Sequence, residues 1–271
     1  LAGVADAAAR AGPGLMLLPV PTGLDPLDSA LSTTTVDGQL VFSVPNDHPV
    51  LALLAQASGP TIVIDAPDDG RSAGFVGIDD RAGARLAVEH LIELDHRRIA
   101  LLTHRLGVDA HPGPVDEARR ASTTVRVARL RLDGGLAALR DAGTDATDVP
   151  VWEATGTDPD AGRVAAEQLL ITHPEVTAIM CFTDQLAIGA AQAARSLGRD
   201  VPGDLSIIGF DDVPRASTWD PPLTTIRQPL VDKGRIAAHM LFAAIEGVSP
   251  TRRMLPIELV VRDSTAPAAR A

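Results

Sequence analysis

Short apolar runs alternate with stretches of helical period along most of the chain. Runs that have the length and composition of buried strands recur at 39–42, 61–65, 99–102, 149–153, 178–182 and 205–208. Apolar residues at three- and four-residue spacing predict helices at 1–10, 27–34, 48–57, 81–94, 124–142, 160–172, 185–197 and 230–247. Because strand and helix keep alternating, we expect an α/β protein with parallel sheets built from right-handed crossovers and flanked by helices.

Three further stretches complete this pattern. The apolar runs at 15–18 and 255–262 are predicted to be strands, whereas 105–121 has no apolar period and is predicted to be a loop. The chain opens on a helix, although parallel strands are joined by helical crossovers and a strand normally precedes the first helix. We therefore expect the sequence to be a fragment whose first strand lies upstream.

The composition fits a core of aliphatic side chains and argues against several functions. Of the 271 residues 45% are hydrophobic but only 3% are aromatic, and tyrosine is absent. The net charge of −11 repels phosphate backbones, so the chain alone is not expected to bind DNA. The single cysteine, Cys181, lies in an apolar run and has no partner for an internal disulfide. Without a signal-peptide pattern or a membrane-spanning apolar stretch, a cytoplasmic protein with no membrane contact is expected.

No catalytic motif supports an enzyme. The sequence has no dinucleotide-binding glycine pattern, no Walker phosphate-binding loop and no nucleophile elbow. Its seven histidines are scattered, so no metal site is predicted, and no other cofactor is expected.

The most informative stretch runs from residue 205 to residue 229. Its strand ends in Gly209-Phe210, and Asp211 and Asp212 follow where ligands collect at the carboxyl ends of α/β sheets. Capping of a turn before Pro214 is the alternative role for this pair of carboxylates. Further along, the chain reads Pro221-Pro222-Leu223-Thr224-Thr225-Ile226.

This stretch resembles the effector-binding domain of lac-repressor-type (LacI/GalR) transcription factors, in which a Gly-aromatic-Asp-Asp turn precedes Pro-Pro-Leu-Thr-Thr-Ile. The run 79–102 resembles the same family's helix-turn-strand signature, with Asp95 where glycine is usual. The resemblance covers nearly the whole chain and implies a two-lobed, periplasmic-binding-protein-like (type I) fold. The first lobe would hold residues 1–103 and 230–249, and the second lobe 104–229 and 250–271. The family's helix-turn-helix DNA-binding domain and first strand are expected to be absent from this chain.

The resemblance places a ligand between the lobes and implies which side chains contact it. Arg131 would reach into the cleft from the helix 124–142, where its guanidinium can bind two ligand oxygens. A solvated basic face is the alternative, because Arg126 and Arg129 lie close to it in the sequence. Asp211 would accept hydrogen bonds from hydroxyl groups. The remaining candidates for effector contact are Asp79, Thr157, Thr183 and Asp184.

These remaining candidates have alternative roles. Asp79 and Asp184 precede helices, where a carboxylate caps the first turn. Family members often carry an aromatic residue at Thr157 and asparagine at Thr183, so this chain departs from the family at two contact positions. Trp152 either replaces the missing ring or packs in the core.

Two functions remain open on the sequence alone. The first is the sensory domain of a LacI-type regulator that binds a small hydroxyl-rich effector, a sugar or a nucleoside-like molecule, and controls operator DNA through its missing domain. The second is the sugar-binding protein of an ABC transport system, which shares the fold. For the regulator the resemblance implies a homodimer with Trp219 and Leu223 at its interface. Packing of Trp219 within its own lobe is the alternative.

Overall fold

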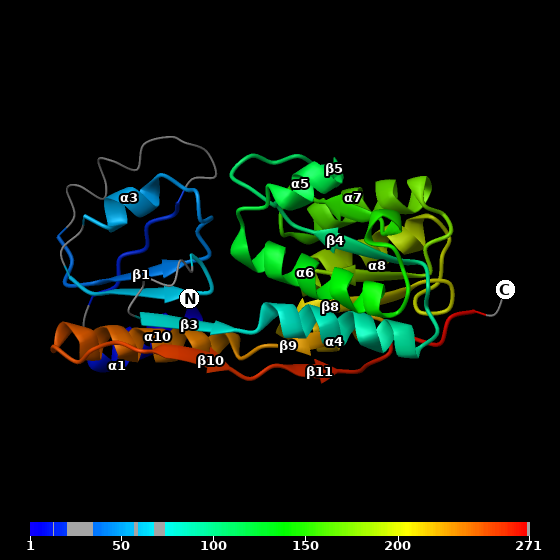
Figure 1. Ribbon diagram of the computed structural model, residues 1–271. Helices are drawn as coiled ribbons and strands as arrows, with labels where there is room; N and C mark the ends of the chain where they lie inside the picture. Colours follow the sequence, from blue (N-terminus) through cyan, green and yellow to red (C-terminus); the bar gives the residue numbers. More distant parts are fainter. Residues whose placement is uncertain (13, 21–34, 57–58, 68–73, 270–271) are drawn as a thin grey trace.

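The computed structural model describes residues 1–12, 14–20, 35–56, 59–67 and 74–269. In these residues the strands form two sheets, and helices cover both faces of each (Figure 1). This arrangement confirms the predicted α/β class with helix-flanked sheets. No helix among the described residues is long and apolar enough to cross a membrane.

The smaller sheet is entirely parallel and has the order β1-β2-β3-β10 in the described part of the chain. Its strands are β1 (Gln39–Phe42), β2 (Thr61–Ile64), β3 (Gly74–Ile78) and β10 (Arg252–Leu255). The helices beside it are α1 (Ala2–Ala11), α3 (Val50–Leu54) and α10 (Leu230–Ile245). Helix α3 packs on one face, α10 packs on the other, and α1 lies against α10. We call this sheet with its three helices the smaller lobe.

The larger sheet has the order β11-β9-β8-β7-β4-β6-β5 in the described residues. Its strands are β4 (Ile99–Thr103), β5 (Gly113–Pro114), β6 (Val151–Glu153), β7 (Ala178–Cys181), β8 (Ser206–Asp211), β9 (Thr224–Arg227) and β11 (Glu258–Val260). The centre of the sheet is parallel, whereas β11 on β9 and β5 on β6 are antiparallel. The edges of this sheet therefore depart from the purely parallel arrangement that the sequence predicts.

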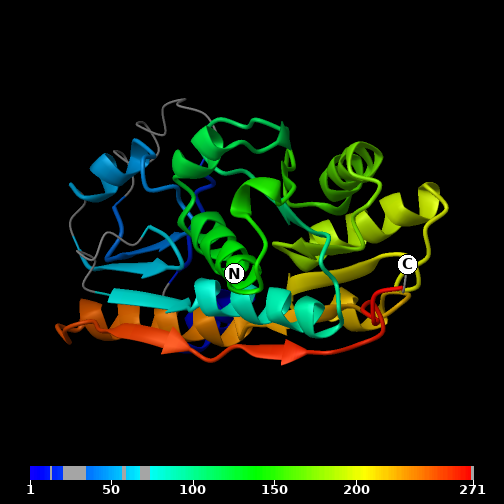
Figure 2. The ribbon, with the colours of Figure 1, turned by 45° about the vertical axis from the view of Figure 1, so that its right-hand side comes forward.

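Helices sandwich the larger sheet, and together they form the larger lobe. They are α4 (Asp80–Glu93), α5 (Glu117–Ala121), α6 (Arg126–Asp141), α7 (Pro159–Thr172), α8 (Asp184–Ser196) and α9 (Pro214–Thr218), with a short 3₁₀ turn at Ala146–Asp148. Helices α4 and α6 pack on one face of the sheet, and α7 and α8 pack on the other (Figure 2).

Glycine lets the paired helices approach each other closely. A Cβ atom on Gly134 of α6 would collide with the carbonyl oxygen of Arg81 in α4. A Cβ on Gly189 of α8 would likewise collide with the carbonyl oxygen of Pro159 in α7. Backbone-to-backbone packing of this kind fixes the position of each helix along its neighbour, and with it the position of the side chains that α4 and α6 present.

The backbone passes between the lobes at three points. Strand β3 leads into α4 at Asp79, β9 leads into α10 at Pro229, and β10 leads into β11 at Pro256. This differs in two places from the division expected from the sequence. Residues 80–103 fold with the larger lobe, because α4 packs against α6 and β4 pairs with β6 and β7. Residues 252–255 join the smaller sheet, because β10 pairs with β3.

Two predicted strands also differ from the structure. The apolar run at 15–18 forms no strand and pairs with none among the described residues, and Leu15, Met16 and Leu17 are exposed. The single strand predicted at 255–262 is divided between two sheets, and Pro256, which has no N–H group, lies at the break. The helix predicted at 27–34 lies outside the described residues.

The C-terminal segment binds the ends of the larger sheet through buried hydroxyl and imidazole groups. His96 Nδ1 lies 2.9 Å from Thr177 Oγ1, and His96 Nε2 lies 2.9 Å from Ser206 Oγ and 3.0 Å from the carbonyl oxygen of Ala266. Ser264 donates to the carbonyl oxygen of Ile207 at 2.6 Å. Since a carbonyl only accepts, Nε2 of the neutral ring carries the proton and Nδ1 accepts from the threonine hydroxyl.

This arrangement predicts acid sensitivity. Burial lowers the pKa of His96 below its ordinary value of 6.5, so the unfolded chain binds more protons than the folded chain between those two pKa values. The free energy of unfolding should therefore fall as pH is lowered below about 6.5. We expect His96→Gln to flatten the pH dependence of the urea midpoint, whereas His239→Gln, at an exposed position, should leave it unchanged. An unaltered pH profile for His96→Gln would contradict this role.

Candidate functional site

Polar side chains from both lobes converge at the carboxyl ends of parallel strands. We define the polar cluster as Asp65, Asp80, Arg131, Asp211, Gln228 and Lys233, which are linked by hydrogen bonds and close charge pairs. Asp65 follows β2, Asp80 follows β3, Asp211 ends β8 and Gln228 follows β9. Strand ends of this kind are where ligands bind in α/β proteins, so the cluster is the candidate site.

Arg131 and Asp80 form the buried centre of the polar cluster. Arg131 Nε and Nη2 contact the same oxygen, Asp80 Oδ1, at 2.9 and 2.8 Å, and Nη1 donates to the carbonyl oxygen of Phe182. The Arg131 guanidinium carbon lies 3.5 Å from the centre of the Phe210 ring. The edge of the same ring packs against Gly83, where a Cβ atom would collide with it. The side chains of Arg131 and Asp80 are 4% and 1% exposed, so both charged groups are shielded from bulk solvent. The basic helix face considered as an alternative for Arg131 is thereby ruled out.

Asp211 lies beside this ion pair and keeps part of its surface open. Its Oδ1 accepts from Gln228 Nε2 at 2.5 Å and lies 3.9 Å from Arg131 Nη2, while its side chain is 18% exposed. Its backbone φ of 120° is one that L-residues rarely adopt, and such strain concentrates at binding sites. Burial raises the pKa of Asp211 to about 6, although Arg131, Gln228 and Lys233 oppose the rise.

The smaller lobe contributes a buried ion pair. Lys233 Nζ donates to both carboxylate oxygens of Asp65 at 2.7 and 2.8 Å, and it also donates to Gln228 Oε1. Asp65 has a φ of 63°, again in the left-handed region. Desolvation raises the pKa of Asp65, with Lys233 opposing the rise. Gln228 therefore joins a charge pair of the smaller lobe to a carboxylate of the larger lobe.

Arg126 connects the lobes directly. It opens α6 in the larger lobe, and its Nη1 donates to the backbone oxygen of Asp65 at 3.0 Å. Its guanidinium carbon lies 5.3 Å from the centre of the Phe75 ring in β3. A backbone bond of 3.2 Å from Asn46 to Thr124 adds a second contact between the lobes. The polar cluster is thus held between two lobes that touch.

His104 is a neutral member of the same environment. It follows β4, stacks edge-on against Phe182 at 6.4 Å between ring centres, and lies 3.0 Å through Nδ1 from the carbonyl oxygen of Arg105. Burial, together with the charge of Arg131, lowers the pKa of His104 to about 4. The ring therefore stays uncharged at neutral pH, and because Nδ1 donates to this carbonyl oxygen, Nε2 is left as an uncharged acceptor.

Asp184 and Thr183 hold the protein's own backbone in place. Asp184 accepts from the Val213 N–H at 2.8 Å and from Thr225 Oγ1 at 2.5 Å, which ties α8 to the turn after β8 and to β9. Burial raises the pKa of Asp184 to about 7. Thr183 Oγ1 accepts from the Leu186 N–H at 3.2 Å and caps α8. The hydrogen bonds found for these two residues support the fold around Asp211.

Asp79 and Thr157 likewise lie at the starts of helices. Asp79 Oδ1 accepts from the Ala82 N–H at 2.9 Å, which makes it the N-cap of α4. Thr157 is exposed in the turn before α7, where Asp158 is the cap. Of the six residues proposed from the sequence for effector contact, the structure brings Arg131 and Asp211 together, and the other four stay predictions.

Asp212, next to Asp211, belongs to a separate group of charges. It accepts from Arg227 Nε at 2.7 Å and from Arg262 Nη2 at 2.6 Å. These two bonds outweigh partial burial and lower the pKa of Asp212. The paired aspartates therefore differ in role, since Asp211 enters the polar cluster whereas Asp212 fixes the neighbouring strands β9 and β11.

The two residues proposed for a dimer interface differ in exposure. Trp219 is partly buried against the core on the α8 side of the larger sheet, and Arg215 lies 5.1 Å from its ring. Leu223 is fully buried within the same core. Leu223 therefore has no surface to offer a partner in this conformation, whereas Trp219 does.

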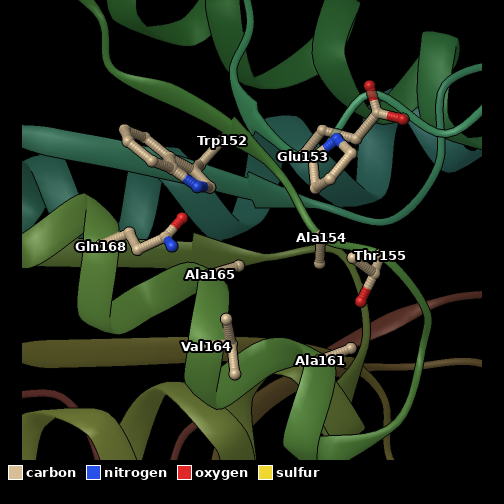
Figure 3. A pocket seen from close by; sticks show the side chains of 9 residues that line it. Trp152, Glu153, Ala154, Thr155, Ala161, Val164, Ala165 and Gln168 are labelled. Carbon is tan, nitrogen blue, oxygen red and sulfur yellow. The ribbon is translucent and has the colours of Figure 1, made fainter.

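A separate small pocket lies between β6 and α7 (Figure 3). Its lining includes Trp152, Ala161, Ala165 and Gln168, and it shares no residue with the polar cluster. Trp152 is buried in the core of the larger lobe, in agreement with the core role considered from the sequence.

Sequence reasoning missed four members of the polar cluster: Asp65, Asp80, Gln228 and Lys233. One signal was available, because Lys233 is the only lysine in the sequence and lies one helical turn before the apolar positions Ile236 and Ala237. Asp65 also ends a predicted strand, as Asp211 does. The pairing of these residues depends on contacts between distant segments, which the local pattern does not encode.

Comparisons with known proteins agree with this architecture. A family model described as a periplasmic binding protein-like domain matches residues 88–265. An HTH-type transcriptional regulator of Mycobacterium tuberculosis is 37% identical over 99% of this chain and 75% of its own length. The solved structure of a LacI-family regulator from Corynebacterium glutamicum has a TM-score of 0.89 at 27% identity, covering 98% of this chain and 80% of that chain. The transcriptional regulator CelR in complex with cellobiose has a TM-score of 0.80 at 30% identity, covering 97% of this chain and 76% of that chain.

The two helix-flanked sheets and the matching family model define a periplasmic-binding-protein-like domain. The chain belongs to the LacI family of transcriptional regulators. This confirms the resemblance found in the turn after β8, and it favours the regulator over the transport protein. Members of this family are regulators and not enzymes, as predicted.

The Arg131–Asp80 pair generates a stability prediction. Arg131→Ala leaves the buried Asp80 charge without its partner, so the free energy of unfolding should fall by about 3–5 kcal/mol. Arg129→Ala is the matched control, because Arg129 lies on the same helix but is exposed, and it should cost at most about 0.5 kcal/mol. Urea denaturation of both variants at pH 7 measures the difference. Equal stability of the two variants would contradict a structural role for Arg131.

Proposed function

We propose that the polar cluster is the effector site of this regulator and that a small hydroxyl-rich molecule, a sugar in the first instance, binds there. The observation that carries the proposal is the convergence of charged groups from both lobes at the carboxyl ends of β2, β3 and β8. The cellobiose bound by CelR, a structural neighbour, is a ligand of this chemical class.

The acceptors that remain open in the cluster fit hydroxyl groups. Asp80 Oδ2 is buried, lies 4.0 Å from Arg126 Nη1 and has no hydrogen-bond partner among the described residues. The side chain of the neighbouring Asp211 is 18% exposed. Carboxylates accept from hydroxyl donors, and the cationic groups nearby can donate to the same molecule. A vicinal diol would satisfy both kinds of group at once.

We further propose that effector binding changes the angle between the lobes and thereby the affinity for operator DNA. A coupling of roughly 1–3 kcal/mol would alter that affinity severalfold to about a hundredfold. Operator contact would come from a helix-turn-helix segment outside this sequence, since the chain carries a net charge of −11. Recognition of paired half-sites would require a homodimer.

Asp211→Asn tests the site. Asparagine tolerates the positive φ at this position and keeps the side-chain size, so the change isolates the carboxylate. We expect a loss of roughly 2–4 kcal/mol in effector affinity, because ligand hydroxyls lose a charged acceptor. In the parent chain affinity should fall as pH is lowered through about 6, where Asp211 becomes protonated. Calorimetric titration with a panel of sugars that begins with cellobiose measures both effects.

The neighbouring Asp212→Asn is the control for this experiment. It removes a carboxylate that is bonded to Arg227 and Arg262 and not to the polar cluster, so sugar affinity should be retained. Undiminished binding by the Asp211→Asn chain would remove Asp211 from the site.

The proposed dimer is tested at Trp219. Trp219→Ala should shift the molecular mass measured by sedimentation toward the monomer, because a partly exposed aromatic side chain is lost from the interface. Leu223→Ala is the comparison: this buried residue should cost about 2–5 kcal/mol of stability without altering the mass. An intact dimer of lowered melting temperature for Trp219→Ala would instead place that side chain solely in the core of its own lobe.

A further inference from the structure

The only lysine of the sequence is buried at the contact between the lobes. Lys233 is 2% exposed, and all three of its ammonium protons are used by Asp65 and Gln228. The sequence has 24 Lys and Arg residues in total, so the other 23 are arginines. A buried ammonium needs full pairing, so each of these contacts constrains its partner.

Gln228 links Lys233 to Asp211, and the donor and acceptor groups of the three side chains allow only one orientation of its amide. An ammonium group only donates, so Gln228 must turn its Oε1 toward Lys233. The amide nitrogen Nε2 of Gln228 must then face the opposite way, where it donates to Asp211 Oδ1 at 2.5 Å. Asp211 Oδ1 is therefore held as an acceptor, which leaves its second oxygen as the one open to another donor.

We propose that Asp65, Lys233 and Gln228 form a directional relay across the lobe boundary that positions the Asp211 carboxylate. Gln228 is the positioning residue, because it lies on the segment between β9 and α10 where the chain passes from the larger to the smaller lobe. The relay rests on the proposed function only in that Asp211 contacts the effector. Any rotation of α10 relative to β8 would stretch the relay and alter Asp211, so lobe angle and effector contact are coupled through one amide.

Several charged groups lie around Asp211, so a substitution that tests the relay must leave their direct electrostatic effects on Asp211 unchanged. Arg131 from α6 and Lys233 from α10 face it as cations, and Asp80 from α4 faces it as an anion. Asp184 of α8 also interacts with it, and because burial raises the pKa of Asp184 to about 7, this carboxyl group changes charge within the same pH range. Only Lys233 reaches Asp211 through an intervening hydrogen-bonded side chain, so removal of Gln228 separates the relay from the direct electrostatic effects.

The single lysine provides a direct measurement. The full chain labelled with ¹⁵N at lysine Nζ gives one side-chain NMR signal, which belongs to Lys233. Followed from pH 5 to pH 8, this signal should show a titration step near the pKa of Asp211, about 6, in addition to any step from Asp65. The Asp211 step is identified by its disappearance in Asp211→Asn.

Gln228→Ala is the decisive variant. It leaves Lys233 bonded to Asp65, and the Asp211 step in the Lys233 signal should shrink at least several-fold. The Asp212→Asn chain is the control and should keep the full step. A second variant, Asp65→Asn/Lys233→Met, removes both charges of the buried pair together. In this variant the titration midpoint of Asp211, followed by ¹³C NMR, should shift to higher pH. An Asp211 step of unchanged size in Gln228→Ala, or an unmoved Asp211 titration in the double variant, overturns the relay.

Addition of cellobiose to the labelled chain separates this inference from the proposed function. Cellobiose that binds at Asp211 should shift the Lys233 signal in the parent chain, and the shift should be lost in Gln228→Ala. The pH titrations involve no sugar, so they decide the relay even where cellobiose leaves the signal in place. A relay that passes these titrations while no sugar of the panel binds would count against the effector site alone.

Discussion

The ion pair of Arg131 with Asp80 is the interaction on which the site depends. It joins α6 to the start of α4, holds the carbonyl end of β7 through Phe182, and contacts the Phe210 ring near the end of β8. Removing both charges from water is costly, and the pair persists because each of the three guanidinium nitrogens has a partner. Two strand ends and two helices are thereby fixed around one point, and Asp211 is placed next to it.

Because most of the cluster is already paired internally, a ligand that contacts those paired groups would exchange partners with the protein. The net affinity is then the difference between new and broken hydrogen bonds, which is much smaller than their sum. Selectivity follows from the same exchange, since a ligand that leaves one of these buried groups unpaired carries a large penalty. If sugars bind there as proposed, the site would discriminate among them by the placement of their hydroxyl groups more than by their size.

Much of the fold could be predicted from the sequence, because the local spacing of apolar residues differs between helices and strands. The strand ending in Phe210 and the helix carrying Arg131 lie where their patterns place them. The run at 15–18 shows the limit, because apolar composition alone supplies no partner strand. Pro256 shows a second limit, because only the pairing of β10 and β11 with other strands reveals that the segments on either side of it belong to different sheets.

The site was less predictable for a related reason. Arg131 and Asp211 were found through a motif, whereas Asp65 and Lys233 are far apart in the sequence and meet only after folding. Asp184, which the sequence predicts to face a ligand, accepts hydrogen bonds from the protein's own backbone and side chains, and its contact with a ligand stays a prediction. A carboxylate at a helix start satisfies either role, and the sequence does not show which N–H group will face it.

The three crossings at Asp79, Pro229 and Pro256 have a mechanical consequence. Two of them contain proline, whose ring restricts backbone rotation, so bending between the lobes has few bonds available to it. Any motion of one lobe against the other would then be confined to a hinge with a narrow range of directions. A lobe pivoting on such a hinge would act as a lever, so that a small displacement at the contacts of Arg126 would become a larger one at the far ends of α1 and α10.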